Sequence, residues 1–345
     1  MNDTLSVVVI GLGHQSCSDH LPAIKESSRY KLIAVCDKEP EKLKSISQQY
    51  NVPGFSSIDE LLKKCLPDVA IVAVPHNAYY EIIEKLAEHH IHIIKEKPFA
   101  TTMEEALKLH YLIEKTGIFL GITLQRRFNP IFQTFLQLKS KIGKIYSIEG
   151  RYTMNIEHLD EGWRAAKKYA GGGALIDMGY HYIDLLVWYM GVPQTVSVKM
   201  STGNRLRQKY DVEDTVNLLF DYHIPNESEK IIGNFIISRV YPHKEECLKI
   251  YGTGGVIELR RDEIKRLDQN GNEIECLIGK GSRLSVAIEQ LDYFYQQIKL
   301  DKRATYTYKE HFKHVAIIEA AYLSNKNRTM IQIGDIMKKN NGGIL

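Results

Sequence analysis

The first third of the chain alternates short apolar segments with helix-length segments, and this alternation restricts the possible folds more than any other feature. Residues 6–10 (Ser-Val-Val-Val-Ile) predict a buried strand, which Gly11-Leu12-Gly13 and a predicted helix follow directly. Strands that alternate with helices of this length form a mainly parallel, doubly wound α/β sheet. The predicted strands are 6–10, 32–36, 52–55, 69–74, 91–94 and 118–123, and the predicted helices between them are 40–50, 58–64, 81–89 and 103–115.

The pattern changes after residue 123. In residues 214–222 apolar and polar side chains alternate, which predicts a strand with one face packed against helices. We therefore predict an amino-terminal α/β domain of the Rossmann type (residues 1–123) and a carboxy-terminal α+β domain with a large, mainly antiparallel open sheet (residues 124–345). Its other predicted strands are 145–154, 231–239, 247–252 and 256–259, with turns at Gly254-Gly255 and Asn270-Gly271. Its predicted helices are 130–140, one opened by segment 171–181, 284–300 and 309–326; the last two would close the chain, and 309–326 would pack back on the first domain.

Length and composition limit the class of protein. The 345 residues exceed one ordinary domain, and a hydrophobic content of 44% with 25% charged residues is typical of soluble globular proteins. A net charge of +3 leaves no broad basic surface for nucleic acid. The longest apolar stretch, near residues 182–190, contains Asp184 and falls short of a membrane span. The predicted partners are therefore small molecules, with no nucleic acid and no membrane.

The cysteines and the amino terminus indicate a cytoplasmic protein. The five cysteines are scattered and form no Cys-x-x-Cys pair, which favours a reduced compartment and no structural metal. The amino terminus has no basic leader, and its apolar run at 7–13 is too short for a secretion signal. The cysteines are Cys17, Cys36, Cys65, Cys247 and Cys276.

The turn after the first strand predicts a dinucleotide site. Gly11 and Gly13 allow a tight turn and a close approach of a pyrophosphate to the amino end of the next helix. Ser16 replaces the third glycine of the fingerprint and is small enough for close helix–strand packing. Asp37 ends the second strand, where an acidic residue binds the hydroxyls of the adenosine ribose. Its charge would repel the extra phosphate of NADP, so NAD is favoured. Lys38 could offset part of that repulsion, and the alternative for Asp37 is a cap of the following helix.

Two more segments follow predicted strands at the carboxyl edge of the sheet, where ligands bind in open α/β folds. Val74-Pro75-His76-Asn77 is one of them, and His76 is either a coenzyme contact or a solvated loop histidine. Glu96-Lys97-Pro98 is the other, where Lys97 would donate a hydrogen bond to a substrate hydroxyl and stabilise a developing alkoxide. Pro98 stiffens the turn and would direct Lys97 into the crevice at this edge of the sheet. The alternative is a Glu-Lys pair exposed on the surface without a function, which would be favoured if the pair stood alone.

Segment 171–181, Gly-Gly-Gly-Ala-Leu-Ile-Asp-Met-Gly-Tyr-His, carries a second candidate group. If it opens a helix, Asp177 and His181 stand four residues apart on one face. A carboxylate beside an imidazole orients the ring and raises its basicity, which makes a proton-handling pair at neutral pH. The alternative is a helix start with a satisfied core histidine.

In their order and spacing these features resemble the glucose–fructose oxidoreductase / inositol dehydrogenase (Gfo/Idh/MocA) family over nearly the whole chain. The lysine segment and the Asp-x-x-x-His motif are specific together. The loop Gly11-Leu12-Gly13-His14-Gln15-Ser16 departs from the usual glycine-rich pattern. The matching segments are Gly11-Leu12-Gly13 with residues 19–24, Glu96-Lys97-Pro98-Phe99-Ala100, residues 125–130, Trp163-Arg164, and residues 171–184, 213–215 and 319–324.

The resemblance implies roles for these residues. Lys97, Asp177 and His181 would be catalytic: His181 as general base on a secondary hydroxyl, Asp177 orienting substrate or imidazole, and Lys97 polarising the oxygen. Hydride transfer to nicotinamide is the chemistry of the cofactor. The candidate cofactor-binding residues, from motifs and resemblance together, are Gly11, Gly13, His14, Gln15, Asp37, Lys38, Val74, Pro75, His76, Asn77, Glu96, Lys97 and Arg164. The candidate substrate-binding residues are Lys97, Arg127, Asn155, Asp177, His181 and Asp184; Arg127, Asn155, Arg164 and Asp184 could equally form structural salt bridges or caps.

We therefore predict an NAD-dependent dehydrogenase, with NADP less favoured, acting on a secondary alcohol or ketone of a sugar, cyclitol or sugar derivative. A basic excess between residues 123 and 200 fits a phosphorylated or nucleotide-linked sugar, or else a solvated helix end. The alternatives are an NAD-dependent glycoside hydrolase on the same scaffold and a non-catalytic NAD or sugar sensor. Residues 1–123 would bind the coenzyme, and 124–345 would bind the substrate and mediate a homodimer or homotetramer.

Overall fold

The computed structural model describes residues 4–223, 230–279, 281–299 and 308–339, which fall into two compact units. The first unit is drawn from Met1–Phe99, Glu105–Phe128 and Gly281–Glu310, and the second from Ala100–Glu104, Asn129–Lys280 and His311–Leu345. This division differs from the expected boundary between residues 123 and 124, because the described segments 281–299 and 308–310 also belong to the first unit.

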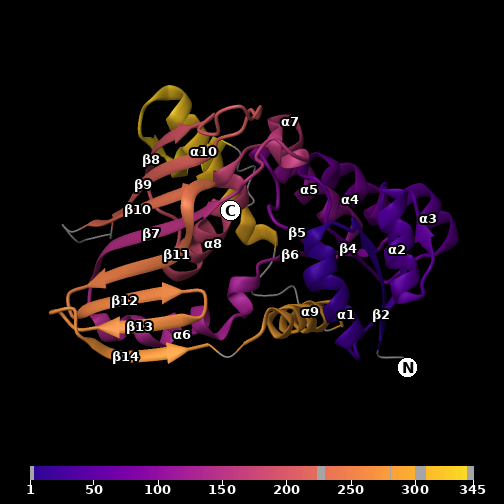
Figure 1. Cartoon of the computed structure of the whole chain (residues 1–345), viewed down its shortest axis with the longest axis horizontal. Coiled ribbons are helices and arrows are strands. Elements are labelled where there is room, and N and C mark those ends of the chain that lie inside the picture. The colour runs from indigo at the N-terminus through magenta and orange to yellow at the C-terminus, as the bar shows by residue number, and fades with distance from the viewer. Residues whose placement is uncertain (1–3, 224–229, 280, 300–307, 340–345) are drawn as a thin grey trace. The chain divides into compact units, whose positions relative to one another are not determined.

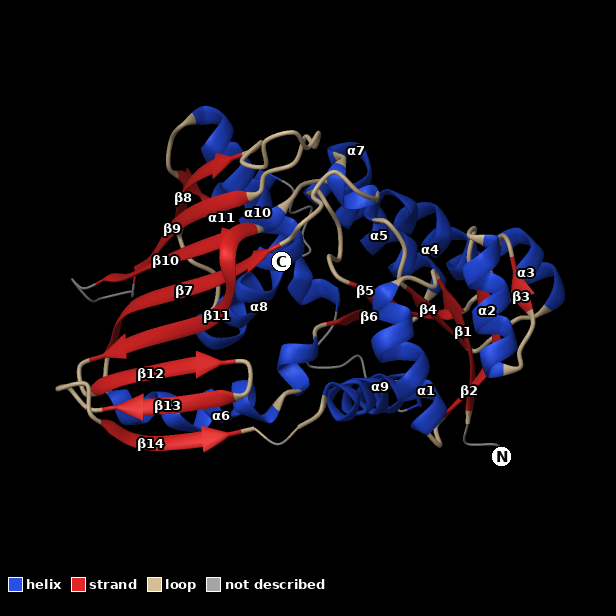
Figure 2. Ribbon diagram, viewed as in Figure 1, coloured by secondary structure: helices blue, strands red, loops and turns tan. Residues whose placement is uncertain are grey.

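The first unit is built on six parallel strands in the order β3-β2-β1-β4-β5-β6 (Figure 1, with all six strands labelled in Figure 2). This is the strand order of a doubly wound dinucleotide-binding fold, in which ligands bind where the order reverses, here between β1 and β4. The predicted parallel α/β fold is confirmed. Its elements are β1 (Leu5–Ile10), the π-helical turn η1 (Ser16–His20), α1 (Leu21–Glu26), β2 (Tyr30–Cys36), α2 (Pro40–Tyr50), β3 (Gly54–Phe55), α3 (Ile58–Lys64), β4 (Val69–Val72), η2 (His76–Ala78), α4 (Tyr79–Glu88), β5 (His92–Glu96), α5 (Met103–Thr116), β6 (Leu120–Thr123), η3 (Gln125–Phe128), α9 (Arg283–Lys299) and η7 (Tyr308–Glu310).

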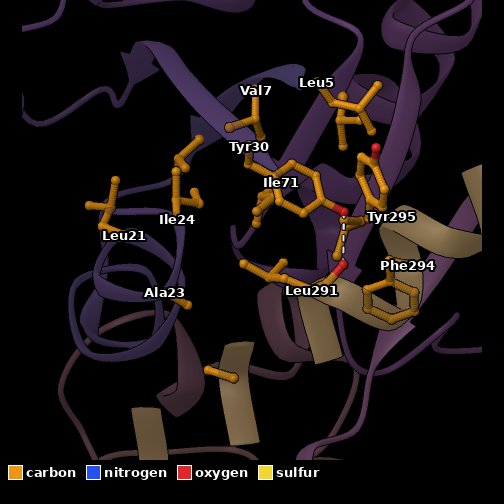
Figure 3. Packing of buried hydrophobic residues seen from close by; sticks show 14 of the residues in the cluster. Leu5, Val7, Leu21, Ala23, Ile24, Tyr30, Ile71, Leu291, Phe294 and Tyr295 are labelled. Atoms are coloured by element: carbon orange, nitrogen blue, oxygen red, sulfur yellow. Dashed lines mark hydrogen bonds between the residues drawn. The ribbon is translucent and has the colours of Figure 1, made fainter. Parts of the chain in front are cut away.

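The central strands of this sheet are buried on both faces, which explains their nearly continuous apolar sequence. Residues 7–9 of β1 have no exposed surface. Helix α9, far along the chain, completes this core: Leu291 packs among the side chains of β1 and α1 (Figure 3). The hydroxyl of Tyr30 donates a hydrogen bond to the backbone oxygen of Leu291 at 2.9 Å. Helix α9 therefore belongs to the first unit, and the packing of 309–326 on that unit stays a prediction.

The second unit is built on a nine-stranded sheet in the order β14-β13-β12-β11-β7-β10-β9-β8-β15. All its strand pairs are antiparallel except β7 with β10, which confirms the predicted mainly antiparallel sheet. Helix α10 packs on β8 and α8, while α6 packs on β12 and β13, so these helices cover one face of the sheet (Figure 2). Its elements are α6 (Pro130–Leu138), η4 (Lys139–Ile142), β7 (Ile145–Asn155), η5 (Trp163–Ala165), α7 (Lys167–Ala170), the π-helical turn η6 (Leu175–Gly179), α8 (Tyr180–Met190), β8 (Thr195–Ser201), β9 (Thr215–His223), β10 (Lys230–Ser238), β11 (Val240–Gly252), β12 (Gly255–Arg260), β13 (Glu263–Leu267), β14 (Glu273–Ile278), α10 (His311–Asn327), β15 (Ile331–Gln332) and α11 (Ile333–Lys339).

Strand β9 shows the alternation that its sequence predicts. Val216, Leu218, Phe220 and Tyr222 are at most 6% exposed, whereas Leu219 between them is 59% exposed. One face of β9 therefore packs on the helices and the other is open.

Several elements differ from the expected ones. Strands β8, β13 and β14 have no predicted counterpart, and α11 follows α10, so the two late helices do not close the chain. Strand β5 continues beyond its expected end at residue 94, because Lys95 and Glu96 pair with Ile122 and Thr123 of β6. Both charged side chains are buried, which hides the end of the strand from an analysis of hydrophobic runs.

Candidate active site

The loop after β1 is shaped by two glycines with different environments. Gly11 has φ +89°, and a Cβ there would lie 2.3 Å from the backbone oxygen of Ala73, so only glycine fits. A Cβ at Gly13 would meet nothing within 4 Å, so the backbone of Gly13 borders open space. Gly11 therefore forms the turn, and Gly13 leaves open space next to the backbone of the loop.

Ser16 closes this loop in place of a third glycine. Its side chain is buried, and its hydroxyl donates a hydrogen bond to the backbone oxygen of Gly11 at 2.5 Å. On the same turn, Gln15 hydrogen-bonds to Asp19, and Asp19 pairs with Arg283 of α9. His14 is exposed and lies 3.4 Å from the hydroxyl of Ser18, measured from Nδ1 to Oγ. The departure from the glycine-rich pattern is therefore compensated by side-chain hydrogen bonds.

Asp37 holds the same loop from the end of β2. Its Oδ2 accepts a hydrogen bond from the backbone N–H of Leu12 at 2.5 Å, and its Oδ1 accepts one from the backbone N–H of Glu39 at 2.8 Å. A carboxylate offers about four lone-pair sites, so two further donors can still bind. Asp37 thus turns the chain before α2, and it keeps acceptor capacity for the hydroxyls of a ribose. Lys38 beside it is exposed.

The segment after β4 contains a buried histidine. His76 is 3% exposed, and its ring stacks on Tyr79 with the centroids 6.1 Å apart. The alternative of a solvated loop histidine is therefore wrong, because the turn η2 folds the ring back on α4. Val74 and Pro75 are half-buried and Asn77 is exposed. Coenzyme contacts by these four residues stay a prediction.

Glu96 and Lys97, at the end of β5, have different surroundings. Glu96 is 8% exposed, and its Oε1 accepts a hydrogen bond from Nε2 of His20 at 2.9 Å. Burial raises the pKa of the Glu96 carboxyl, but the hydrogen bond and charge of His20 and the charge of Lys97 outweigh it and hold that pKa below its usual value. Lys97 is half-buried and precedes a cis peptide bond to Pro98. The carboxylate is therefore anchored inside the unit, and the following lysine retains exposed surface.

In the second unit, the glycine-rich segment permits a close approach of other segments of the same chain. A Cβ at Gly173 would lie 2.0 Å from the backbone oxygen of Glu213, and one at Gly172 would lie 1.9 Å from the hydroxyl of Tyr322. The backbone N–H of Ala174 donates to the oxygen of Glu213 at 2.8 Å. This contact fixes the start of the segment that carries the candidate proton-handling pair.

Asp177 and His181 are the accessible residues of that segment. Asp177 lies in the π-helical turn η6, and His181 lies in the first turn of α8. Every other residue from 174 to 187 is buried, whereas these two are half-buried. π-helical turns inside helices occur frequently at functional sites. The expected helix is therefore present, with a π-helical first turn, and it leaves Asp177 and His181 accessible.

Two arginines bind Asp177. Arg239 Nη2 lies 2.9 Å from Asp177 Oδ2, and Arg164 Nε lies 3.2 Å from the same oxygen. Arg239 is 1% exposed and also donates to the backbone oxygen of Gly173 at 3.1 Å. Arg164 is exposed, and its guanidinium lies 4.3 Å from the ring centroid of Trp163. The position of the Asp177 carboxylate is therefore fixed by two guanidinium groups that bind one of its oxygens.

The remaining candidate substrate residues each make a structural contact within their own unit. Arg127 pairs with Glu310 at 3.3 Å, inside the first unit. Asn155, at the end of β7, accepts a hydrogen bond from Arg205 through its side-chain oxygen. Asp184 has no exposed surface, and its Oδ1 lies 2.9 Å from Nε2 of His314. Substrate contacts by these residues, and the convergence of Lys97 with Asp177 and His181, stay predictions.

Two family models match the chain. Residues 5–123 match the model of an oxidoreductase family with an NAD-binding Rossmann fold, named GFO_IDH_MocA, and residues 138–258 match the carboxy-terminal domain of the same family. The chain belongs to the Gfo/Idh/MocA family. It is an NAD-binding oxidoreductase, as the sequence resemblance implied.

Proteins similar to this chain include an uncharacterised oxidoreductase and two dehydrogenases with named substrates. An uncharacterised oxidoreductase, C115.03 of Schizosaccharomyces pombe, is 25% identical over 240 residues, which are 68% of this chain and 64% of that protein. The scyllo-inositol 2-dehydrogenase (NADP(+)) IolW of Bacillus subtilis is 24% identical over 356 residues, 96% of each chain. The solved structure of levoglucosan dehydrogenase in complex with NADH and levoglucosan shares the fold, with a TM-score of 0.83 and 20% identity, covering 96% of this chain and 99% of that one.

The first unit of this oxidoreductase fits a dinucleotide. The open space at Gly13 and the remaining acceptor capacity of Asp37 lie at the carboxyl ends of β1 and β2, next to the point where the strand order reverses. Among the described residues, no three His, Cys, Asp or Glu side chains are grouped as metal ligands would be. No helix in the described ranges is both long and apolar enough to cross a membrane.

The structure adds residues that sequence reasoning missed. Arg239 follows the last residue of β10, where nothing in its spacing distinguishes it from a surface arginine. His20 lies in the segment that resembles the family, but its contact with Glu96 joins residues 76 positions apart. Lys95 lies one residue beyond the expected end of its strand at residue 94, and it is fully buried. Only burial and long-range contacts identify these three.

Proposed function

We propose that this protein is an NAD-dependent dehydrogenase that moves a hydride between nicotinamide and a secondary alcohol or ketone of a sugar, cyclitol or sugar derivative. The observation that carries the proposal is the accessible pair Asp177 and His181 in an otherwise buried segment. The names of the relatives support it, since IolW is a scyllo-inositol dehydrogenase and levoglucosan dehydrogenase was solved with a sugar derivative. A phosphorylated or nucleotide-linked sugar belongs to the same proposed class.

The roles of the residues follow from their chemistry. The bound coenzyme would supply the hydride acceptor. His181, which is half-buried, would take the proton of the substrate hydroxyl as general base, because a ring nitrogen of a neutral imidazole can accept a proton. Lys97 would donate a hydrogen bond to the same oxygen and stabilise the negative charge that develops on it. Asp177, bound by Arg164 and Arg239, would orient the substrate or the imidazole.

The preference for NAD rests on Asp37. Its carboxylate would bind the ribose hydroxyls and repel a 2′-phosphate. The relative IolW is named for NADP(+), so the coenzyme preference of this protein needs its own measurement. We expect a higher kcat/KM with NAD than with NADP, and we expect Asp37→Ala to reduce that difference.

A panel of polyols, inositols and sugars tests the function. One substrate class should yield NADH, and Lys97→Ala should reduce kcat far more than it weakens NADH binding. Cleavage of a glycoside without net NADH would instead indicate a hydrolase that uses transient oxidation. Ligand binding without any turnover across the panel would indicate a sensor. Equal effects of Lys97→Ala on turnover and on NADH binding would contradict the role of Lys97.

We also propose a cytoplasmic homodimer or homotetramer. The open face of the nine-stranded sheet carries Leu219 and Ile232, each 59% exposed, together with polar residues, so it could bury a mixed surface against a second copy. Light scattering measured together with size-exclusion chromatography should give two or four copies. A monomer at micromolar concentration would contradict this proposal.

A further inference from the structure

Three consecutive charged residues lie at the end of strand β5, two in the strand (Lys95 and Glu96) and one directly after it (Lys97), and their side chains have different surroundings. Lys95 has no exposed surface, Glu96 is 8% exposed, and Lys97 is half-buried. Successive residues of a strand point to opposite faces of the sheet. Lys95 therefore enters the layer on one face, where it meets Tyr79 of α4, and Glu96 enters the other, where it meets His20.

The ammonium of Lys95 folds back on the chain that follows Lys97. Its Nζ donates hydrogen bonds to the backbone oxygens of Pro98 at 2.5 Å and Phe99 at 2.9 Å. The same Nζ lies 3.7 Å from the ring centroid of Tyr79, within the range of a cation–π contact. An ammonium has three N–H donors, and these contacts give each of them an acceptor.

The bonds from Lys95 close a short loop around Lys97. Residues 95, 98 and 99 are joined by side-chain hydrogen bonds, so the backbone on both sides of Lys97 is tied to the same buried group. Glu96 is held on the opposite face by His20. Lys97 therefore directly follows two anchored residues, one on each face of the sheet.

An apolar residue at position 95 would suit a buried strand, but it would give no hydrogen-bond donor to the backbone oxygens of Pro98 and Phe99. Pro98 and Phe99 are buried, so their carbonyl oxygens would lose a buried donor. Burial lowers the pKa of the Lys95 ammonium to about 7, while the charges of Glu105 and Glu96 act in the opposite direction. Burial of a lysine is energetically unfavourable, so its presence at this position indicates that its hydrogen bonds to the Pro98 and Phe99 oxygens have a function.

We propose that Lys95 is a positioning residue that sets the direction of the Lys97 side chain by tying the Pro98–Phe99 backbone to the end of β5. This inference rests on the proposed function, in which Lys97 polarises the substrate oxygen. Lys95 itself touches neither substrate nor coenzyme in this scheme.

The test compares Lys95→Met with a control on the same strand face. Lys95→Met keeps an unbranched side chain that is one atom shorter and removes its donors. Ile93→Ala loosens the same face two residues earlier, where Ile93 is also fully buried, and leaves the donors in place. We expect Lys95→Met to lower kcat at least tenfold, to leave the substrate KM and the NADH dissociation constant within threefold, and to exceed the loss of kcat in Ile93→Ala.

A second measurement does not depend on turnover. In the protein without substrate, mass spectrometry gives the rate at which an amine-reactive reagent labels Lys97. We expect Lys95→Met to change this rate at least threefold and Ile93→Ala to leave it unchanged. If Lys95→Met does not fold, Lys95→Gln, which keeps an uncharged N–H donor, takes its place and should show the same changes to a smaller degree.

The outcomes separate the two proposals. If Lys97→Ala loses activity and Lys95→Met behaves like Ile93→Ala in both kcat and labelling, the positioning role is overturned and the function stands. If Lys97→Ala keeps its activity, the assigned function of Lys97 fails, whereas the labelling experiment still decides whether Lys95 fixes that side chain.

Discussion

Gly11 and Gly13 lie two residues apart in one loop, and the structure predicts opposite consequences for the same substitution at each. A Cβ at position 11 would lie 2.3 Å from the backbone oxygen of Ala73, and the φ of +89° is unfavourable for any side chain. A Cβ at position 13 would meet nothing within 4 Å. Gly11→Ala should therefore destabilise the protein, and Gly13→Ala should affect mainly the binding of the coenzyme.

The magnitudes follow from the two environments. A side chain in the left-handed region costs about 1–2 kcal/mol, and displacing a packed backbone costs about 1–3 kcal/mol more. Gly11→Ala should therefore lower the free energy of unfolding by about 2–5 kcal/mol, or the melting temperature by roughly 5–15 °C. Gly13→Ala should change the free energy of unfolding by less than about 0.5 kcal/mol. Its methyl group would fill space that a pyrophosphate needs, so NADH affinity should fall at least tenfold, which is about 1.4 kcal/mol.

Two assays separate these effects. Thermal unfolding without coenzyme measures stability, and the fluorescence of NADH on titration measures its dissociation constant. A loss of stability in Gly13→Ala equal to that in Gly11→Ala would refute the assignment of open space at position 13. An unchanged dissociation constant for Gly13→Ala would show that the coenzyme does not approach this loop.

Three further substitutions test the packing and charges described above. Leu291→Ala should cost about 2–5 kcal/mol of stability, measured by urea unfolding, because α9 completes the core of the first unit. The pKa of Glu96 is held low in the folded state, so its stabilising contribution should be complete above its ordinary value of 4.5 and be lost as the pH falls through the lower folded value. Glu96→Gln should flatten that part of a stability–pH curve. Arg239→Met removes a buried partner of Asp177 and should lower stability by about 3–5 kcal/mol in thermal unfolding and also lower kcat, with NADH affinity unchanged.

The sequence predicted those parts of the fold that depend on local periodicity. The buried strands of the first sheet and the alternation of β9 follow from hydrophobic patterns of 4–9 residues. Helix α9 could not be assigned to the first unit in this way, because its contact with β1 joins segments about 280 residues apart in the sequence. Lys95 and Glu96 ended the predicted strand early, since a hydrophobic run gives no sign that a charged residue is buried.

The candidate site was predictable to a similar extent. The glycine turn, Asp37, and the Asp177–His181 pair are recognisable because their spacing along the chain reflects local geometry. Arg239 reaches Asp177 across 62 residues, and no pattern in the sequence marks that pairing. Residues that hold a catalytic group in place contact it through the tertiary structure, so they are the part of a site that a sequence motif omits.

The buried ammonium of Lys95 gives a pH dependence whose sign can be worked out. Burial lowers its pKa in the folded protein from the ordinary 10.5 to about 7. Between these values the unfolded chain binds more protons than the folded one, so stability should rise with pH across this window. Lys95→Met lacks this group. Raising the pH from 7 to 9.5 should therefore increase the unfolding free energy of the wild type relative to that of Lys95→Met. Urea unfolding at the two pH values measures the shift. A difference that does not change with pH would mean that the carbonyls of Pro98 and Phe99 hold Lys95 protonated throughout and fully offset its desolvation.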